Sequence, residues 1–279
     1  MTSNTITGVD IVISRDGTMI NYKTIGSGPG VIVIHGVLST AANYSVLAAL
    51  LGQNFTVYSI ERRGRGLSGP QGEDYSMIKE CEDIEALQNH IGASYLFGHS
   101  YGGLIALEVA RNNKAFKKIA VYDPGVSIDG LIAVSWMPAY QKYLAEKKYL
   151  DAFAIFSITA GPENAQKMPL WLMKLLLPFF IKKQERQQMY KLLPANLLEH
   201  KEVAKKDNSY KNYREVSAGV LLMFGGKSKL VGITKAIKVL LEVLPLAKPL
   251  EFPKLDHFGP DKTGPIDIAA KVTEYFMEK

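Results

Sequence analysis

The segment Gly98–Gly103 reads Gly-His-Ser-Tyr-Gly-Gly and holds a serine whose surroundings suit nucleophilic chemistry. The pattern before it predicts a strand over Ser94–Phe97, and the pattern after it predicts a helix over Leu104–Asn112. A tight turn from strand to helix needs glycines two residues on either side of the serine, because larger side chains would collide there. Such a turn lifts the hydroxyl clear of the sheet. The sequence therefore predicts that Ser100 is a nucleophile.

The general base for a serine nucleophile is expected late in the chain if the order is serine, acid, histidine. His257 stands in a predicted loop between the last strand and the last helix. Of the other histidines, His90 is near a helix end and His99 lies inside the tight turn. His200, in a middle segment without strands, is the weaker alternative. We predict that His257 takes the serine proton.

Two backbone amides are candidates for stabilising a tetrahedral oxyanion. The amide of Tyr101 is at the start of the helix that follows the nucleophile, and Val37 follows a predicted buried strand, Val31–Ile34. His35 lies between that strand and Val37. We expect His35 to brace the loop rather than carry protons, although the carboxyl end of a parallel strand is also where ligands bind in open sheets.

The elements that must position these residues alternate between strand and helix up to Pro124 and again from Val220. This alternation predicts a parallel sheet covered by helices on both faces, an α/β fold. The segment between is helix-like and without strands. We therefore expect a core domain of residues 1–126 and 216–279 and a helical insertion of residues 127–215. The expected helices of the insertion are Met137–Leu150, Leu170–Ile181 and Glu185–Leu198, with breaks at Pro162, Pro169, Pro178 and Pro194.

Four motifs together resemble the α/β-hydrolase superfamily. They are a His-Gly pair after a strand, the run Glu-Arg-Arg-Gly-Arg-Gly-Leu-Ser at residues 61–68, the Gly-His-Ser-Tyr-Gly-Gly turn, and the late Asp-His pair. The resemblance covers nearly the whole chain outside the insertion. It implies a mostly parallel eight-stranded sheet flanked by helices, with a helical cap inserted after strand 6. Arg63 and its glycines match the family's R-G-x-G-x-S turn, with Glu61 in place of the usual aspartate.

The triad acid departs from the pattern of many family members, which place an aspartate where this chain has Ser228. A serine cannot stabilise an imidazolium by charge, so the acid must come from elsewhere. Asp123 ends the preceding strand, from which some family members supply the acid, and it lies between Ser100 and His257 in the chain. We predict Asp123. Asp256, Glu61 and Asp129 are weaker alternatives.

These residues predict a serine hydrolase that cleaves a carboxylic ester or thioester of a small to medium apolar substrate through an acyl-enzyme. No cofactor or metal is expected. A carbon–carbon bond hydrolase or a cofactor-free haloperoxidase-like enzyme of the same fold is the first alternative. A ligand-binding or signalling protein without catalytic activity is the second, motivated by Ser228.

The insertion is expected to set the substrate. Trp171, Leu175 and Phe179 form an apolar surface that we expect to line the pocket over the nucleophile. Helices that simply pack on the core would show the same pattern. Lys182 and Lys183 beside this surface permit contact with a membrane interface, but no stable membrane insertion is expected.

Composition narrows the class further. The chain has 279 residues and a net charge of +6, mostly within residues 127–215, without a long Lys/Arg run. This favours a solvated helical surface over nucleic-acid binding and leaves a small-molecule substrate as the expected partner. The beginning of the sequence lacks a signal-peptide pattern, and no apolar run is long enough to cross a bilayer, so we expect a cytoplasmic location. The single cysteine, Cys81, excludes an internal disulfide.

Overall fold

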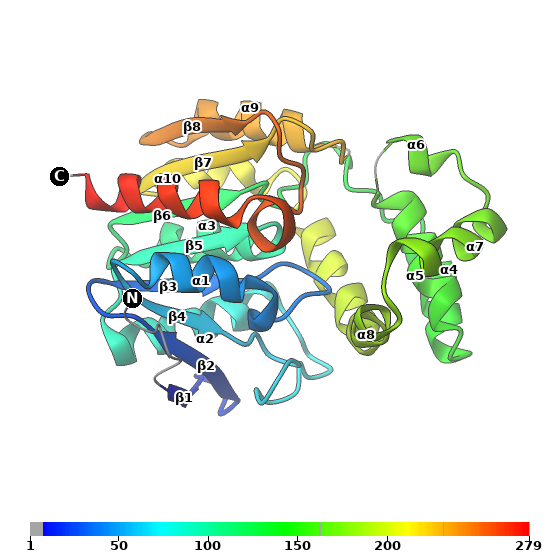
Figure 1. Ribbon diagram of the computed structural model, residues 1–279, viewed down its shortest axis with the longest axis horizontal. Helices are drawn as coiled ribbons and strands as arrows, with labels where there is room; N and C mark the ends of the chain where they lie inside the picture. The colour runs from blue at the N-terminus through cyan, green and yellow to red at the C-terminus, as the bar shows by residue number, and fades with distance from the viewer. Residues whose placement is uncertain (1–7, 162, 231, 279) are drawn as a thin grey trace.

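The computed structural model describes residues 8–161, 163–230 and 232–278, and its central feature is one twisted sheet (Figure 1). The first seven residues of the expected core domain lie outside the described part. The sheet has eight strands in the order β1-β2-β4-β3-β5-β6-β7-β8. The β1–β2 and β2–β4 pairs are antiparallel and the other pairs parallel, which confirms the expected mostly parallel sheet. The strands are β1 (Gly8–Ile13), β2 (Met19–Ile25), β3 (Gly30–Ile34), β4 (Thr56–Ile60), β5 (Tyr95–His99), β6 (Lys118–Tyr122), β7 (Gly219–Gly225) and β8 (Ala247–Phe252).

Helices bury both faces of this sheet, as the apolar composition of its inner strands requires. One hydrophobic cluster joins the sheet to α1 and α10, and a second joins it to α2, α3 and α9. The two sets of helices lie on opposite faces (Figure 1). These helices are α1 (Ser45–Leu51), which follows the 3-10 turn η1 (Ala41–Tyr44), α2 (Met77–Ile91), α3 (Tyr101–Asn112), α9 (Ile233–Val243) and α10 (Pro265–Met277).

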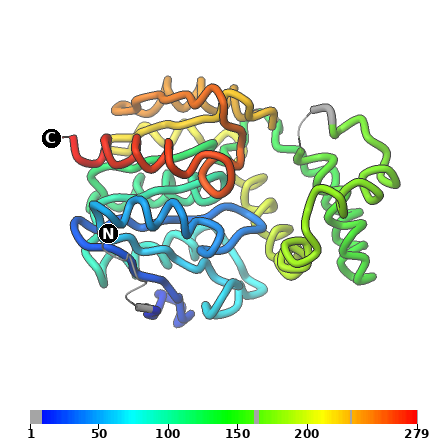
Figure 2. Tube along the Cα trace, in the orientation of Figure 1, coloured from blue at the N-terminus to red at the C-terminus, as the bar shows by residue number. Residues whose placement is uncertain are grey.

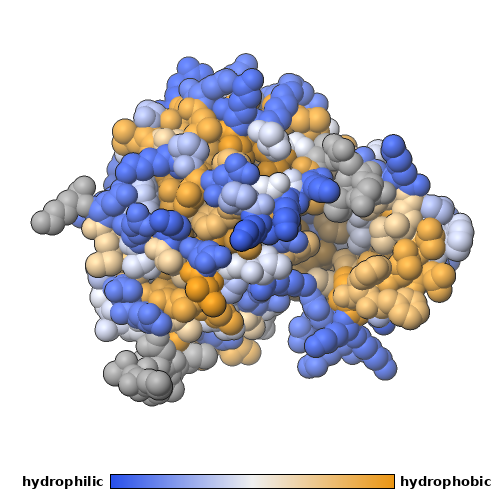
Figure 3. Space-filling model, turned by 45° about the horizontal axis from the view of Figure 1, so that its top comes forward, coloured by the Kyte–Doolittle hydropathy of each residue, from blue (hydrophilic) through white to orange (hydrophobic). Residues whose placement is uncertain are grey.

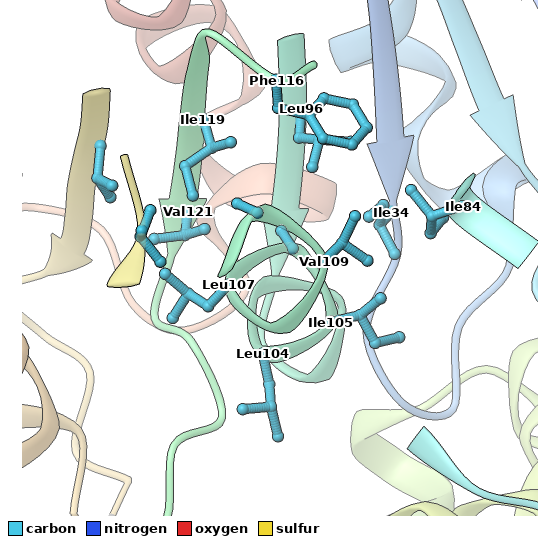
Figure 4. Packing of buried hydrophobic residues seen from close by; sticks show 14 of the residues in the cluster. Ile34, Ile84, Leu96, Leu104, Ile105, Leu107, Val109, Phe116, Ile119 and Val121 are labelled. Atoms are coloured by element: carbon cyan, nitrogen blue, oxygen red, sulfur yellow. The ribbon is translucent and has the colours of Figure 1, made fainter. Parts of the chain in front are cut away.

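The helix after Ser100 is central to the fold. Ile105 and Val109 of α3 pack near Ile34 of β3 and Leu96 of β5 (Figure 4). The residues of α3 are buried from Tyr101 to Ala110. The helix begins three residues earlier than predicted, because the chain passes directly from β5 through Ser100 into the first helical turn. A deeply buried helix on rigid strands therefore fixes the serine.

Strand register brings the loops that carry the predicted site to one edge of the sheet. Gly98 pairs with Ile34, His99 with Tyr122, and Tyr122 with Met223. The segments that follow β3, β5, β6 and β7 therefore leave the sheet side by side. Residues distant in sequence meet there, as is typical of the carboxyl edge of a parallel sheet.

The chain between β6 and β7 forms helices that extend from this edge and return to it (Figure 2). They share a hydrophobic cluster of their own, which includes Trp136, Tyr140, Phe153 and Leu193. The final turns of the insertion rejoin the core, since Val203 and Tyr213 belong to the cluster around α3. The elements are α4 (Met137–Ala145), α5 (Tyr149–Thr159), α6 (Glu163–Gln166), α7 (Leu170–Phe180), α8 (Lys183–Lys205) and the 3-10 segment η2 (Ser209–Glu215).

Three helix boundaries of the insertion were predicted wrongly. The single helix expected over Met137–Leu150 is two helices, because Lys147 has a left-handed φ of 56° that no α-helix accommodates. Pro178 and Pro194 lie inside α7 and α8 instead of ending helices. The break predicted at Pro162 lies outside the described residues. In the described part of the chain, no helix combines the length and hydrophobicity needed to cross a membrane.

A buried ion-pair network fastens α8 to the core. Glu199 of α8 accepts hydrogen bonds from the guanidinium groups of Arg62 and Arg65, which follow β4. Arg62 also forms a two-pronged ion pair with Glu80 of α2. These side chains are almost completely buried. Breaking such a pair by removing one partner is costly, so the position of α8 over the sheet edge is strongly specified.

Candidate active site

The predicted nucleophile occupies a strained turn. Ser100 has a φ of 54° and a ψ of −119°, between β5 and α3. A Cβ atom on Gly98 would come within 2.4 Å of the carbonyl oxygen of Gly102, and one on Gly102 within 2.3 Å of that of Ile34. Both glycines are therefore required sterically, as the sequence pattern indicated. A strained backbone held by such close packing is typical of a functional position.

His257 and Asp123 meet beside this turn. Nδ1 of His257 lies 3.1 Å from Oδ2 of Asp123, and the Asp123 side chain is fully buried. Asp123 follows β6 directly and has a φ of 42°, a backbone region that aspartate and asparagine tolerate better than most residues. His257 follows β8, ahead of a short π-helix, Gly259–Thr263. Because Nδ1 faces the carboxylate, Nε2 is the ring nitrogen that remains available to accept a proton.

Ser228 supports the Asp123 carboxylate. Its hydroxyl donates a hydrogen bond to Oδ2 of Asp123, the oxygen that also faces His257. The backbone N–H of Gly225 donates to Oδ1 at 3.3 Å. The residue that replaces the usual aspartate is therefore a donor to the acid at the neighbouring strand.

The alternative carboxylates are engaged elsewhere in the described structure. Asp256 accepts a hydrogen bond from the N–H of Phe258, and Glu61 accepts one from the N–H of Ala41. Asp129 pairs with Lys235 at the surface. No hydrogen bond joins any of the three to His257 within the described residues.

The two predicted oxyanion donors, Val37 and Tyr101, line the same cavity as Ser100, His257 and Asp123. Tyr101 opens α3, and the amides of a first helical turn have no acceptor within the helix. The positive end of the helix dipole adds to the attraction for a developing negative charge. Both residues line the cavity beside Ser100, and their role as oxyanion donors stays a prediction.

His99 has a positioning role that the sequence did not indicate. Its Nε2 lies 2.8 Å from the backbone carbonyl oxygen of His257, and its Nδ1 forms a hydrogen bond with the hydroxyl of Tyr44. Burial, with a smaller contribution from His257, holds the pKa of His99 well below its ordinary value. The neutral ring therefore donates from Nε2 and accepts at Nδ1 from Tyr44. The resulting chain of hydrogen bonds ties the loop of His257 to η1.

His35 is a buried residue that does not line the cavity. Its Nε2 accepts a hydrogen bond from the N–H of Arg62 at 3.3 Å, and its Nδ1 is 3.0 Å from the carbonyl oxygen of Gly36. Burial and the nearby charges of Arg65 and Arg62 hold its pKa well below the ordinary value. A neutral ring bound at both nitrogens braces the loop before Val37 and leaves no free position for a substrate.

The cavity above Ser100 has a volume of about 570 Å³ and is closed in part by the inserted helices. Trp171, Leu175 and Phe179, which were expected to line it, do not. They are 68%, 56% and 80% exposed. Met173 and Leu177 supply the buried face of α7, so residues two positions away point outward. The residues that the insertion contributes to the cavity are instead Leu131, Ile132, Ala133, Phe153, Phe156, Ser157, Thr159, Ala160, Gly161, Ile181, Glu185, Met189, His200 and Val203.

The outward face of α7 forms an exposed hydrophobic surface at the far end of the inserted helices (Figure 3). Single exposed apolar residues are common, but Trp171, Leu175, Phe179 and Phe180 lie together on one short helix. The periodicity of α7 cannot separate a face turned to the cavity from one turned to solvent, because both are apolar.

Asp261, on the π-helix after His257, also lines the cavity. Burial raises the pKa of its carboxyl from 3.8 to about 6. One of its oxygens, Oδ1, is buried without a hydrogen-bond partner in the part of the chain that the structure describes. The sequence pattern did not indicate that Asp261 would be buried at the cavity, because the residue lies in a predicted loop.

Comparison with known proteins agrees with the fold described above. Residues 31–263 match the model of the alpha/beta hydrolase family. The crystal structure of an alpha/beta hydrolase from Sphaerobacter thermophilus is similar, with 26% identity, a TM-score of 0.82, and coverage of 96% of this chain and 100% of that one. An esterase from Thermogutta terrifontis has a TM-score of 0.74 at 17% identity, covering 97% and 98% of the two chains.

Among curated sequences, an N-formylmaleamate deformylase from Pseudomonas putida is 31% identical over 123 residues, 42% of this chain and 46% of that protein. This chain spans less than half the length of the curated relatives that it matches.

Proposed function

Because the chain belongs to the alpha/beta hydrolase family, we propose that it hydrolyses a carboxylic ester or thioester of a small to medium apolar substrate through an acyl-enzyme on Ser100. The observation that carries the proposal is the 3.1 Å contact between His257 and the buried carboxylate of Asp123, in the cavity that also holds Ser100. A histidine oriented by a carboxylate beside a serine at a strained turn is the arrangement that activates a hydroxyl.

The proposed reaction has two halves, of which the first acylates Ser100. His257 takes the hydroxyl proton as the Ser100 oxygen attacks the substrate carbonyl carbon. The carbonyl oxygen becomes negatively charged and is stabilised by the amides of Val37 and Tyr101. The imidazolium then returns its proton to the departing alcohol or thiol, and the acyl group remains on Ser100.

The second half uses the same groups on water. His257 removes a proton from a water molecule that attacks the acyl-serine carbonyl. Collapse of the second tetrahedral intermediate releases the carboxylic acid and returns the proton to Ser100. Asp123 keeps the proton of the neutral imidazole on Nδ1 and stabilises the positive charge of the protonated ring in both halves. This chemistry requires neither a metal nor an organic cofactor.

We further propose that residues 127–215 form a cap that selects the substrate. The cavity-facing side chains Phe153, Phe156, Ile181 and Val203 are apolar and favour an apolar acyl or alcohol group. Glu199 holds the cap helix α8 in place through its buried ion pairs.

A panel of p-nitrophenyl esters and thioesters of varied chain length tests the proposal. Hydrolysis is expected, and Ser100→Ala should lower it by about a thousandfold or more while the protein remains folded. Ser157→Ala is the matched control and should retain hydrolysis. The hydroxyl of this cavity serine donates a hydrogen bond to the carbonyl oxygen of Phe153 and has no histidine partner in the proposed reaction. A Ser100→Ala variant that retained turnover would contradict the assignment. Cleavage of a β-diketone without ester turnover would favour the carbon–carbon alternative.

A further inference from the structure

His200 is a buried histidine that the reaction does not use, yet it lines the same cavity as Ser100. It lies on α8, in the segment proposed as the cap, and only 8% of it is exposed. The rings of Trp136 and Phe156 contact its ring edge-to-face, with centroids 5.3 and 5.1 Å away. Two aromatic side chains therefore hold the imidazole in one orientation.

The hydrogen-bond partner of His200 determines which nitrogen carries its proton. Nδ1 lies 2.9 Å from the carbonyl oxygen of Asn196, one helical turn earlier. A carbonyl oxygen only accepts, so Nδ1 must hold the hydrogen. Burial lowers the pKa of His200, against smaller opposing effects of the Asn196 hydrogen bond and the Glu199 carboxylate. The ring is neutral, and Nε2 presents a lone pair.

Nε2 has no hydrogen-bond partner among the residues that the structure describes. Phe156, the cavity side chain whose ring contacts that of His200, offers no donor. An acceptor on the wall of a cavity can be served by water, but a ligand that displaces this water and offers no donor leaves the acceptor unpaired, which is unfavourable.

We propose that Nε2 of His200 accepts a hydrogen bond from a hydroxyl or amide N–H of the substrate, away from the bond that is cleaved. The proposal rests on the proposed function of Ser100 and narrows its substrate class to esters that carry such a donor. The clamped ring fixes the direction of the hydrogen bond, so it orients the substrate as well as selecting it.

Two matched ester series test this. The first compares p-nitrophenyl esters of straight-chain acids with the same acids bearing a terminal hydroxyl, and the second compares alkyl esters with diol monoesters. The wild-type protein should prefer the hydroxylated member of at least one pair by about tenfold or more in kcat/KM, the effect of one good hydrogen bond. Absence of any preference across both series would overturn the proposal.

Substitutions locate the acceptor. His200→Phe keeps an aromatic ring between Trp136 and Phe156 but removes the lone pair. The ratio of kcat/KM between the hydroxylated and the plain ester should therefore fall to near one. His200→Gln, which retains an acceptor oxygen, should keep part of it. Ser157→Ala removes a rival polar group of the cavity and should leave the preference intact. A preference that persisted in His200→Phe would assign the acceptor elsewhere.

Binding to the Ser100→Ala protein separates this proposal from the proposed function. Calorimetry should show tighter binding of the hydroxylated ester of a pair, and His200→Phe in that background should remove the difference. If this occurs although the wild-type protein hydrolyses no ester, the function is wrong and the subsite stands. If esters are hydrolysed but hydroxylated and plain esters bind equally, the function stands and the subsite is wrong.

Discussion

Replacing Asp123 by asparagine should remove the charge behind His257 while preserving the fold. Asparagine tolerates the positive φ of 42° at this position, and its oxygen can still accept the hydrogen bond from Gly225. Its amide nitrogen, however, donates to Nδ1 of His257, where the carboxylate accepted. The ring proton then moves to Nε2, and His257 can no longer accept the proton of Ser100.

The expected loss follows from two effects, the wrong tautomer and the missing counter-charge for the imidazolium. Together they should lower kcat by roughly four orders of magnitude, which is about 5 kcal/mol of transition-state stabilisation. The assay is p-nitrophenyl ester hydrolysis with kcat and KM determined separately, alongside the thermal midpoint. An Asp123→Asn enzyme within tenfold of wild-type kcat and with an unchanged midpoint would refute the reasoning.

Ser228 offers a rescue because its hydroxyl already contacts the Asp123 oxygen that faces His257. Ser228→Asp in the Asp123→Asn background restores a carboxylate beside the ring and should recover at least tenfold in kcat, a small part of what was lost. Ser228→Asn in the same background is the uncharged control and should recover nothing. Equal recovery by both would show that charge is not what His257 requires.

Three further perturbations test the surrounding structure. Burial raises the pKa of Asp261 in the folded protein to about 6, against an ordinary value of 3.8, so the folded state binds this proton more tightly than the unfolded state. The free energy of unfolding should therefore fall as pH rises from about 4 to about 6, by at most about 3 kcal/mol. Asp261→Asn should abolish this pH dependence in thermal melts, whereas Asp10→Asn, at an exposed carboxylate, should leave it unchanged. Glu199→Gln leaves buried arginine charge less well compensated and should cost about 3–5 kcal/mol in urea unfolding; a change below 1 kcal/mol would contradict the importance assigned to that network. Tyr44→Phe leaves Nδ1 of His99 without a donor and should cost about 1–3 kcal/mol, with no loss expected if that hydrogen bond is absent in solution.

The sheet could be predicted from sequence because its signals are local. The run Val31–Ile34 is continuous and β-branched, and the structure places β3 over Gly30–Ile34. The glycines around Ser100 are likewise a local steric requirement, visible in six residues. Strand alternation then implies which loops share an edge, and this places Ser100, Asp123 and His257 together.

The insertion could not be predicted in the same detail because its contacts are tertiary. No glycine or proline marks the boundary at Lys147 between α4 and α5, and Pro194 continues a helix that packing stabilises. The two apolar faces of α7 look alike in sequence, so Trp171 was expected in the cavity and lies at the surface. His200 was considered only as an alternative base, since nothing local indicates that α8 turns it toward the cavity.

The central claim is that Ser100 is a nucleophile activated by His257 and Asp123, and covalent labelling tests it most directly. A fluorophosphonate probe should form one adduct per chain, located on Ser100 by peptide mass spectrometry. Labelling should disappear in Ser100→Ala, become much slower in Asp123→Asn, and persist in Ser157→Ala. A wild-type protein that forms no adduct, or that is labelled at another residue, would contradict the account.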